Sequence, residues 1–177
     1  LSLSERCRIS NAAGADYFVS IHTDAFGDGK SWTEPSGWSA HVIAKGGNAQ
    51  RLAEAIRAEA IPMLGCRDRG VRVSNYQVLR DTKAPAVLIE FAYHDNVEDA
   101  NWIKNNINAI ARNVVLSLTE YFGLPFIAPG PVRQGTVSVG QGSLNIRSRP
   151  TTSSQVVAHA YNGNPITVYG RWKDWYS

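Results

Sequence analysis

A glutamate and a histidine, two residue types that can do hydrolytic chemistry, each occur in an apolar run that indicates a buried strand. Glu90 lies within residues 86–92 (AVLIEFA), and His22 ends residues 17–22 (YFVSIH), after which a polar loop begins. Burying an unpaired carboxylate is unfavourable, so such a group normally finds a partner or is neutralised. The pattern makes Glu90 a candidate general acid or base and His22 a candidate ligand of a catalytic zinc ion.

The residues alone leave two plainer interpretations open. A histidine at a strand end is more often a hydrogen-bonded core residue than a ligand, and Glu90 could pair with an arginine such as Arg80. Three further histidines lack partners at ligand spacing and are interpreted as structural or surface groups: His41, His94 and His159.

The elements that must position these residues alternate between strands and helices. Strands are predicted over 17–22, 39–44, 76–80 and 86–92, and helices over 3–13, 48–64 and about 96–121. Residues 65–75 are predicted to be a basic, turn-rich connection. This alternation predicts an α/β domain with a largely parallel sheet flanked by helices. Because sites in such folds collect at the carboxyl ends of strands, we expect His22 and Glu90 to lie in one cleft.

The end of the chain has a different character. Prolines and glycines mark residues 125–135 as a linker between a first domain, 1–124, and a second, 136–177. Short strand-like runs separated by turns predict that the second domain is a small all-β barrel. Residues 126–177 hold five Lys or Arg against one acidic residue, which favours an anionic polymer as partner. Three aromatic residues could offer flat faces to such a partner: Trp172, Trp175 and Tyr176.

Composition excludes some classes of protein. The chain is 44% hydrophobic and 19% charged, as in ordinary globular domains. No apolar stretch approaches the roughly 18 residues that a membrane-spanning helix needs. Cys7 and Cys66 lack the spacing of a metal site, and free thiols are favoured over a disulfide.

Four ordered segments resemble a known enzyme family. Residues 14–25 (GADYFVSIHTDA) resemble the "gaD-x-x-x-SiHaNa" segment of the zinc-dependent N-acetylmuramoyl-L-alanine amidases of the amidase_3 type. Residues 69–71 (RGV) look like the "RGvk" segment and 78–80 (VLR) like the "VLR" segment of that family. Residues 85–91 (PAVLIEF), leading to Asn96, look like "PavLvE-x-gF-x-sN". Asp24 departs from this pattern, because the family often has Asn there.

The resemblance implies roles for two residues. His22 matches one zinc-binding histidine and Glu90 matches the catalytic glutamate. The family's other two zinc ligands, a histidine and a glutamate, are expected upstream of Leu1. The chain is therefore expected to be an internal fragment, inactive unless those ligands are supplied.

The tail resembles a second family. Residues 144–150 (LNIRSRP), together with the later tryptophans, are similar to the opening of a bacterial SH3 (SH3b) wall-binding domain. Such a domain normally continues beyond the last residues of this chain, so the barrel is expected to be partial.

Together the resemblances imply a peptidoglycan hydrolase, either an endolysin or an autolysin. It would cleave the amide between N-acetylmuramic acid and L-alanine with zinc-activated water, and would act outside the cell, at the wall, or after release by phage lysis. Peptidoglycan is the expected partner, with no role for nucleic acid or membrane. Two alternatives stay open: a non-catalytic cell-wall-binding protein, and a nucleic-acid binder suggested by the basic tail.

Overall fold

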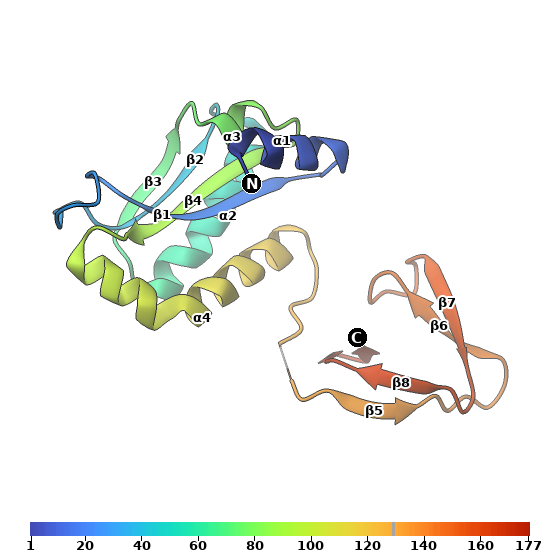
Figure 1. Ribbon diagram of the computed structural model, residues 1–177. Coiled ribbons are helices and arrows are strands. Elements are labelled where there is room, and N and C mark those ends of the chain that lie inside the picture. The colour runs from blue at the N-terminus through green and yellow to red at the C-terminus, as the bar shows by residue number, and fades with distance from the viewer. Residues whose placement is uncertain (129) are drawn as a thin grey trace. The chain divides into compact units, whose positions relative to one another are not determined.

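The computed structural model describes residues 1–128 and 130–177, with Trp172 described by its backbone. It divides into two compact units, Leu1–Phe122 and Gly123–Ser177 (Figure 1). The range expected to be a linker, 125–135, falls in the second unit, and strand β5 (Arg133–Thr136) begins within it. Pro129 of that range lies outside the described residues, as does the side chain of Trp172 in the expected aromatic cluster.

The first unit is built on one four-stranded sheet. Its strands, in the order β1-β4-β2-β3, are β1 (Phe18–Asp24), β4 (Ala86–Tyr93), β2 (Trp38–Val42) and β3 (Asp68–Val73). The pairs β1–β4 and β2–β3 are parallel, and β4–β2 is antiparallel. The expected α/β layer with a largely parallel sheet is confirmed, with one antiparallel junction between its two halves.

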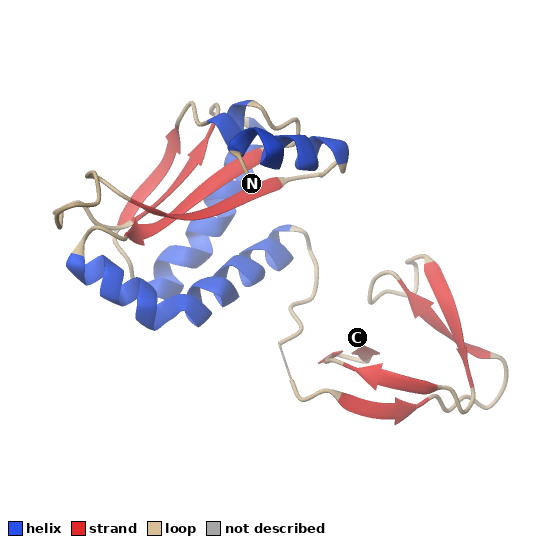
Figure 2. Ribbon diagram, viewed as in Figure 1, coloured by secondary structure: helices blue, strands red, loops and turns tan. Residues whose placement is uncertain are grey.

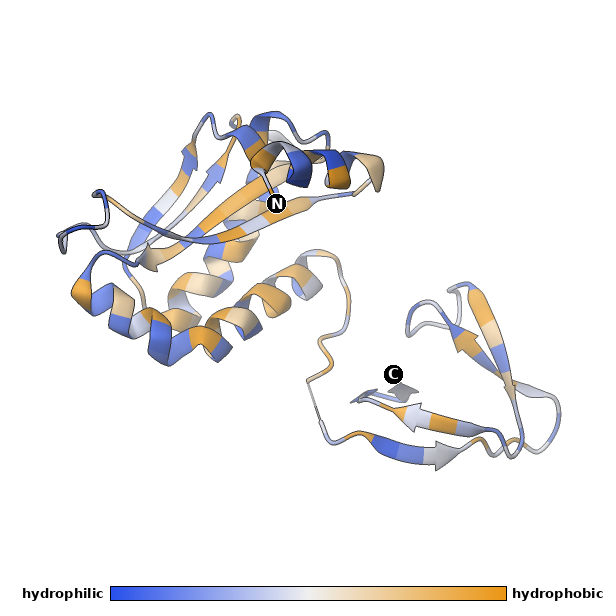
Figure 3. Cartoon of the chain, in the orientation of Figure 1, coloured by the Kyte–Doolittle hydropathy of each residue, from blue (hydrophilic) through white to orange (hydrophobic). Residues whose placement is uncertain are grey.

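Helices cover both faces of this sheet (Figure 1). They are α1 (Leu3–Ala12), α2 (Gly47–Leu64), α3 (Gln77–Arg80) and α4 (Val97–Tyr121). The main core cluster joins alternate residues of β4, such as Ile89 and Phe91, to α2 and α4. The intervening residues Ala86 and Leu88 join a smaller cluster with α1 and α3. Because successive strand residues face opposite sides, all of β4 is buried and apolar along most of its length (Figure 3).

Local signals explain where the helices begin and end. The Ser2 hydroxyl accepts a hydrogen bond from the backbone N–H of Glu5, and the Asn96 side chain accepts from two N–H groups in the first turn of α4. Each cap satisfies donors that a helix start leaves unpaired. Gly65, at a φ of 63°, ends α2 in the left-handed region that glycine adopts readily.

Two segments differ from the sequence-based prediction. Residues 76–80 do not form a strand, because the helical turn α3 lets both Val78 and Leu79 reach the smaller core cluster, whereas neighbours in a strand would face opposite sides. Residues 65–75 are not only a turn-rich connection, since β3 occupies most of them. β3 is an edge strand with mostly polar or half-exposed side chains, so it lacks the apolar pattern of a buried strand.

A bulge interrupts the pairing of β1 with β4. His22 pairs with Glu90 and Asp24 pairs with Tyr93, so β4 carries one more residue than β1 over this stretch. Ala92, within the bulge, has a φ of 70°, a conformation that L-residues with a side chain rarely adopt. In the family pattern that residues 85–96 resemble, the position of Ala92 is a glycine.

The second unit contains strands and loops among its described residues (Figure 2). Three antiparallel pairs form: β5 with β8 (Pro165–Val168), β6 (Ser143–Arg147) with β7 (Val156–Tyr161), and β9 (Arg171–Trp172) with β10 (Trp175–Tyr176). This confirms a small all-β unit. Across the described residues no helix has the length and apolarity to cross a bilayer, and Cys7 and Cys66 are free thiols.

We expect Ala92→Gly to stabilise the first unit, by up to about 1 kcal/mol, because glycine removes the left-handed strain, which amounts to about 1–2 kcal/mol, while losing one buried methyl group. Urea unfolding, followed by helix ellipticity, measures the change. The matched control is Ala86→Gly, at an ordinary strand position of β4. It should lower stability by about 1 kcal/mol. Equal losses in both variants would show that the Ala92 conformation is unstrained.

Candidate functional site

Strand pairing brings the two candidate residues together. In the parallel register of β1 and β4, His22 is the direct partner of Glu90. Neighbouring strands lie about 4.8 Å apart, and paired residues project from the same face of a sheet. Both residues lie near, rather than at, the ends of their strands, because β1 continues to Asp24 and β4 to Tyr93. The structure thus places His22 and Glu90 side by side.

The face that carries this pair changes character along the sheet. At the beginning of β4, Ala86 and Leu88 pack against α1 and α3. Further along, Glu90 is flanked by His22 on β1 and by Ser39, its partner in the antiparallel register with β2. The polar side chains of His22, Ser39 and Glu90 therefore lie together toward the carboxyl ends of strands β1 and β4.

Glu90 is a buried carboxyl with few interactions that would stabilise its charge. Its side chain belongs to a residue that is 8% exposed, and Oε2 has no hydrogen-bond partner among the described residues. Burial, and next the nearby Asp24 carboxylate, raise the pKa of Glu90 to about 7, against the opposing charge of Arg69. A carboxyl that titrates near neutral pH is suited to general acid–base chemistry.

The alternative pairing of Glu90 with Arg80 does not form. The Arg80 guanidinium instead contacts the Asp81 carboxylate at 3.0 Å and the Asn75 side chain at 2.9 Å. Arg80 ends the turn α3 and is exposed, so it does not offset the buried charge of Glu90.

His22 is half-buried and held by a single described hydrogen bond. Its Nε2 lies 2.7 Å from the Oγ of Ser20, which projects from the same face two residues earlier. Burial, and next the positive charge of Arg6, lower the pKa of His22. Both effects favour the neutral imidazole, which is the form that binds metal ions, and the contact with Ser20 fixes the ring.

A complete metal site is not present among the described residues. No group of three His, Cys, Asp or Glu side chains lies close enough there to hold a metal ion. Because catalytic zinc usually has three protein ligands, the described residues offer one imidazole and do not fit a zinc ion by themselves.

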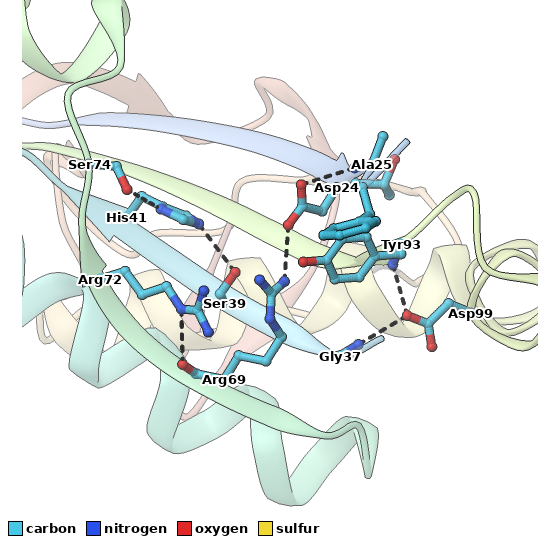
Figure 4. A network of polar contacts seen from close by, with 12 residues as sticks. Asp24, Ala25, Gly37, Ser39, His41, Arg69, Arg72, Ser74, Tyr93 and Asp99 are labelled. Atoms are coloured by element: carbon cyan, nitrogen blue, oxygen red, sulfur yellow. Dashed lines mark hydrogen bonds and ion pairs between the residues drawn. The ribbon is translucent and has the colours of Figure 1, made fainter. Parts of the chain in front are cut away.

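The other histidines have local partners. His41 is buried, with Nε2 3.2 Å from the Ser39 hydroxyl and Nδ1 2.7 Å from the Ser74 hydroxyl (Figure 4). His94 contacts Thr23, and His159 contacts Ser143. Their interpretation as structural or surface groups agrees with these contacts.

A second polar group, formed by Asp24, Arg69 and Tyr93, lies at the end of β1 (Figure 4). The charges of Asp24 and Arg69 act on Glu90. An Asp24 carboxylate oxygen lies 3.0 Å from the Arg69 guanidinium, whose carbon is 4.6 Å from the centre of the Tyr93 ring. The side chains of Arg69 and Asp24 are only 15% and 23% exposed. Burial and the Asp24 carboxylate raise the pKa of Tyr93 to about 12.

Sequence reasoning assigned no role to Arg69 or Tyr93. One signal did exist: Asp24 stands where the family often has the neutral Asn, and a half-buried carboxylate needs a cation. The identity of that cation could not be read from spacing, because Arg69 lies on a strand that was not predicted.

A mainly apolar groove of about 830 Å³ runs along the other side of β1. Ile21, His22 and Thr23 form one border, and isoleucines and valines of α4 form most of the opposite wall. Ile107, one of these, is 61% exposed.

In the second unit, aromatic and basic side chains share a smaller cavity. The cavity has a volume of about 280 Å³. It is lined by the arginines Arg133 and Arg171, by the exposed tyrosines Tyr169 and Tyr176, and by residues of the expected linker. The Arg171 guanidinium carbon lies 5.5 Å from the centre of the Tyr176 ring.

Glu90→Gln should flatten the pH dependence of stability in the metal-free protein. The carboxyl titrates at about 7 when folded and near 4.5 when unfolded, so the folded state binds more protons between these values. The wild type should therefore lose stability as pH rises through this window, by at most about 3 kcal/mol. Urea unfolding at several pH values, with a chelator present, measures the slope. Glu120→Gln, at an exposed site, should keep the wild-type slope; an unchanged slope in Glu90→Gln would contradict the burial argument.

Comparison with known proteins adds family information to this geometry. A family model described as N-acetylmuramoyl-L-alanine amidase (amidase_3) matches residues 1–120, and one described as a bacterial SH3 domain matches residues 142–177. The N-acetylmuramoyl-L-alanine amidase CwlM of Bacillus licheniformis is 33% identical over 127 residues, which cover 70% of this chain and 47% of that protein. The endolysin of Bacillus phage SPP1 is 32% identical over 148 residues, which cover 81% of this chain and 55% of that protein. The chain thus spans about half the length of these relatives.

Solved structures agree with the sequence comparison. The crystal structure of N-acetylmuramoyl-L-alanine amidase from Clostridium difficile 630 matches with a TM-score of 0.63 and 26% identity, covering 70% of this chain and 66% of that chain. The family match takes in more than half of the residues, including both strands that carry His22 and Glu90. The chain therefore belongs to the amidase_3 family of N-acetylmuramoyl-L-alanine amidases.

Proposed function

We propose that the full-length protein hydrolyses the amide bond between N-acetylmuramic acid and L-alanine in peptidoglycan, with Glu90 as the general acid–base. One observation carries this proposal: His22 and Glu90 are register partners, and the Glu90 carboxyl has a pKa of about 7. The pair lies within the residues that match the amidase family.

The proposed reaction uses both protonation states of Glu90. A carboxyl with a pKa near 7 is divided between its charged and neutral forms at neutral pH. As the carboxylate, Glu90 accepts a proton from the water that attacks the lactyl carbonyl carbon. As the carboxylic acid, it donates that proton to the alanine nitrogen while the carbon–nitrogen bond breaks. A lactyl carboxylate and a free amino group result.

We assign zinc as the cofactor and His22 as one of its ligands. This assignment rests on the neutral state favoured for the imidazole and on the hydrogen bond between Nε2 and the Ser20 hydroxyl, which orients the ring. Since the described residues contain no three-ligand cluster, we expect these 177 residues alone to bind zinc weakly and to be inactive.

The second unit is proposed to tether the enzyme to the cell wall. Its supports are the match to a bacterial SH3 domain, the excess of basic residues and the exposed Tyr169 and Tyr176. Tethering raises the local concentration of substrate without adding a catalytic contact. This places the proposed site of action at the wall, as for an autolysin or an endolysin.

Replacing Glu90 by Gln in the full-length protein should lower the hydrolysis of purified cell walls by ~10²–10⁴-fold, because the amide cannot exchange a proton. Release of new alanine amino groups measures the rate. Near-normal release would overturn the catalytic role of Glu90. Inactivity of the wild type would favour the non-catalytic wall-binding alternative.

His22→Ala serves as the contrasting variant. It should lose both activity and zinc, whereas Glu90→Gln should keep its zinc. Elemental analysis after gel filtration separates the two outcomes. His94→Ala, at a histidine that contacts Thr23, is the matched control and should keep its zinc. Full zinc content in His22→Ala would exclude His22 as a ligand.

In the full-length protein, removing residues 123–177 should abolish co-sedimentation with intact walls while leaving cleavage of a soluble fragment of peptidoglycan unchanged. Tethering of this kind contributes ~10²-fold or more to apparent affinity. Sedimentation at two salt concentrations, with a DNA retention assay alongside, measures the effect. Retention on DNA by a protein that does not sediment with walls would favour the nucleic-acid alternative.

A further inference from the structure

We propose that Arg69 is a positioning residue for the hydrolysis: its ion pair with Asp24 clamps the end of β1 and so holds His22 beside Glu90. The inference rests on the proposed function for its kinetic test. Its structural content, a clamp that fixes the His22 imidazole, can be tested without any reaction.

The ion pair joins opposite edges of the sheet. Asp24 belongs to β1 and Arg69 to β3, which are the first and last strands in the order β1-β4-β2-β3. Three strand spacings correspond to about 14 Å. The long Arg69 side chain therefore reaches across the polar end of the sheet to meet the Asp24 carboxylate at 3.0 Å (Figure 4).

The same guanidinium also contacts the strand that carries Glu90. Arg69 lies over the ring of Tyr93, with 4.6 Å between the guanidinium carbon and the ring centre. Tyr93 is the register partner of Asp24, so the guanidinium closes a three-way contact between β1, β3 and β4. The backbone N–H of Tyr93 donates to Asp99 at the start of α4, which fixes the other end of this contact.

The clamp lies next to an irregularity in the pairing of β1 with β4. The β1–β4 ladder is interrupted immediately after the His22–Glu90 pair, where the bulge around Ala92 adds a residue to β4, and it resumes with the pair Asp24–Tyr93. Among the described strands, β1 has β4 as its single neighbour. Beyond the bulge, the backbone N–H of His94 donates to the Asp24 carbonyl oxygen at 2.9 Å, and the Arg69 guanidinium adds a restraint on the side chain of the same residue. We infer that loss of this side-chain restraint lets the last residues of β1 shift at the bulge and displaces His22.

Asp24 is held at both of its oxygens. Oδ1 accepts a hydrogen bond from the backbone N–H of Ala25 at 2.9 Å, and Oδ2 meets Arg69. Because the side chains of Asp24 and Arg69 are both mostly buried, the carboxylate has few alternative positions. Arginine suits this role better than lysine because its planar group can pair with a carboxylate and stack on an aromatic ring at once.

In the full-length protein, Arg69→Ala should lower kcat by ~100-fold while KM for a soluble muropeptide changes less than ~3-fold, since displacement of catalytic groups by about 1 Å has effects of this size. Arg69→Lys should recover only part of the loss, because it keeps the charge without the planar contact over Tyr93.

The chain provides a matched control, a second arginine–aspartate pair that involves strand β3. Arg57 of α2 pairs with Asp68, the first residue of β3, at 2.6 Å, and the two side chains are 37% and 29% exposed. Arg57→Ala removes a comparable arginine–aspartate pair without touching β1 or Tyr93. It should lower the unfolding midpoint while leaving kcat at the wild-type value.

Two further measurements separate positioning from simple stability. Asp24→Ala combined with Arg69→Ala should lose little more kcat than either single variant, because each single variant already removes the same clamp. In the metal-free 177-residue chain, Arg69→Ala should shift and broaden the His22 imidazole NMR signals, and Arg57→Ala should leave them unchanged.

Wild-type kcat in Arg69→Ala, or equal kcat losses in Arg69→Ala and Arg57→Ala, would overturn the proposal. Unchanged His22 signals in Arg69→Ala would also overturn it. An inactive wild-type protein would refute the proposed function, and the NMR comparison would then still decide whether the clamp exists.

Discussion

The parallel register between β1 and β4 is the constraint on which the rest of the site depends. It makes His22 and Glu90 direct neighbours although they lie far apart in the sequence. Because side chains alternate between the two faces of a strand, a slip of one residue would turn His22 toward α4 and leave Glu90 without it. The apolar residues of both strands hold the register, since Val19 of β1 and Val87 and Ile89 of β4 pack in the main core.

The same register divides the Glu90 face into two environments. α1 and α3 cover its first half, where Ala86 and Leu88 are apolar. The second half carries the polar residues His22, Ser39 and Glu90, and the charge of Arg6 on α1 acts on His22 there. Glu90 sits between these environments, buried enough to raise its pKa to about 7 and near enough to Asp24 and Arg69 to respond to their charges. A carboxyl fully inside the core would be permanently protonated, whereas one on the surface would be permanently charged at neutral pH.

The sequence was a good guide to the buried elements and a poor guide to the exposed ones. β4 and α4 were predicted nearly to their ends, because long apolar runs and helical spacing reflect burial. β3 and α3 were not, because an edge strand shows little apolar pattern and a single helical turn has no period. His22 and Glu90 stood out because each interrupts an apolar run. The ion pair on which the proposed role of Arg69 rests spans the whole sheet, and no local sequence pattern contains it.

The exposed edge of β1 has a consequence for how the protein behaves in solution. Among the described strands, that edge has no partner, and it borders the apolar groove beneath α4. Free backbone donors and acceptors next to apolar side chains form a template on which another strand can add. Any strand added there would pack directly against the segment that carries His22. Concentrated preparations of these 177 residues should therefore aggregate through this edge, and His22 would become buried in the aggregate.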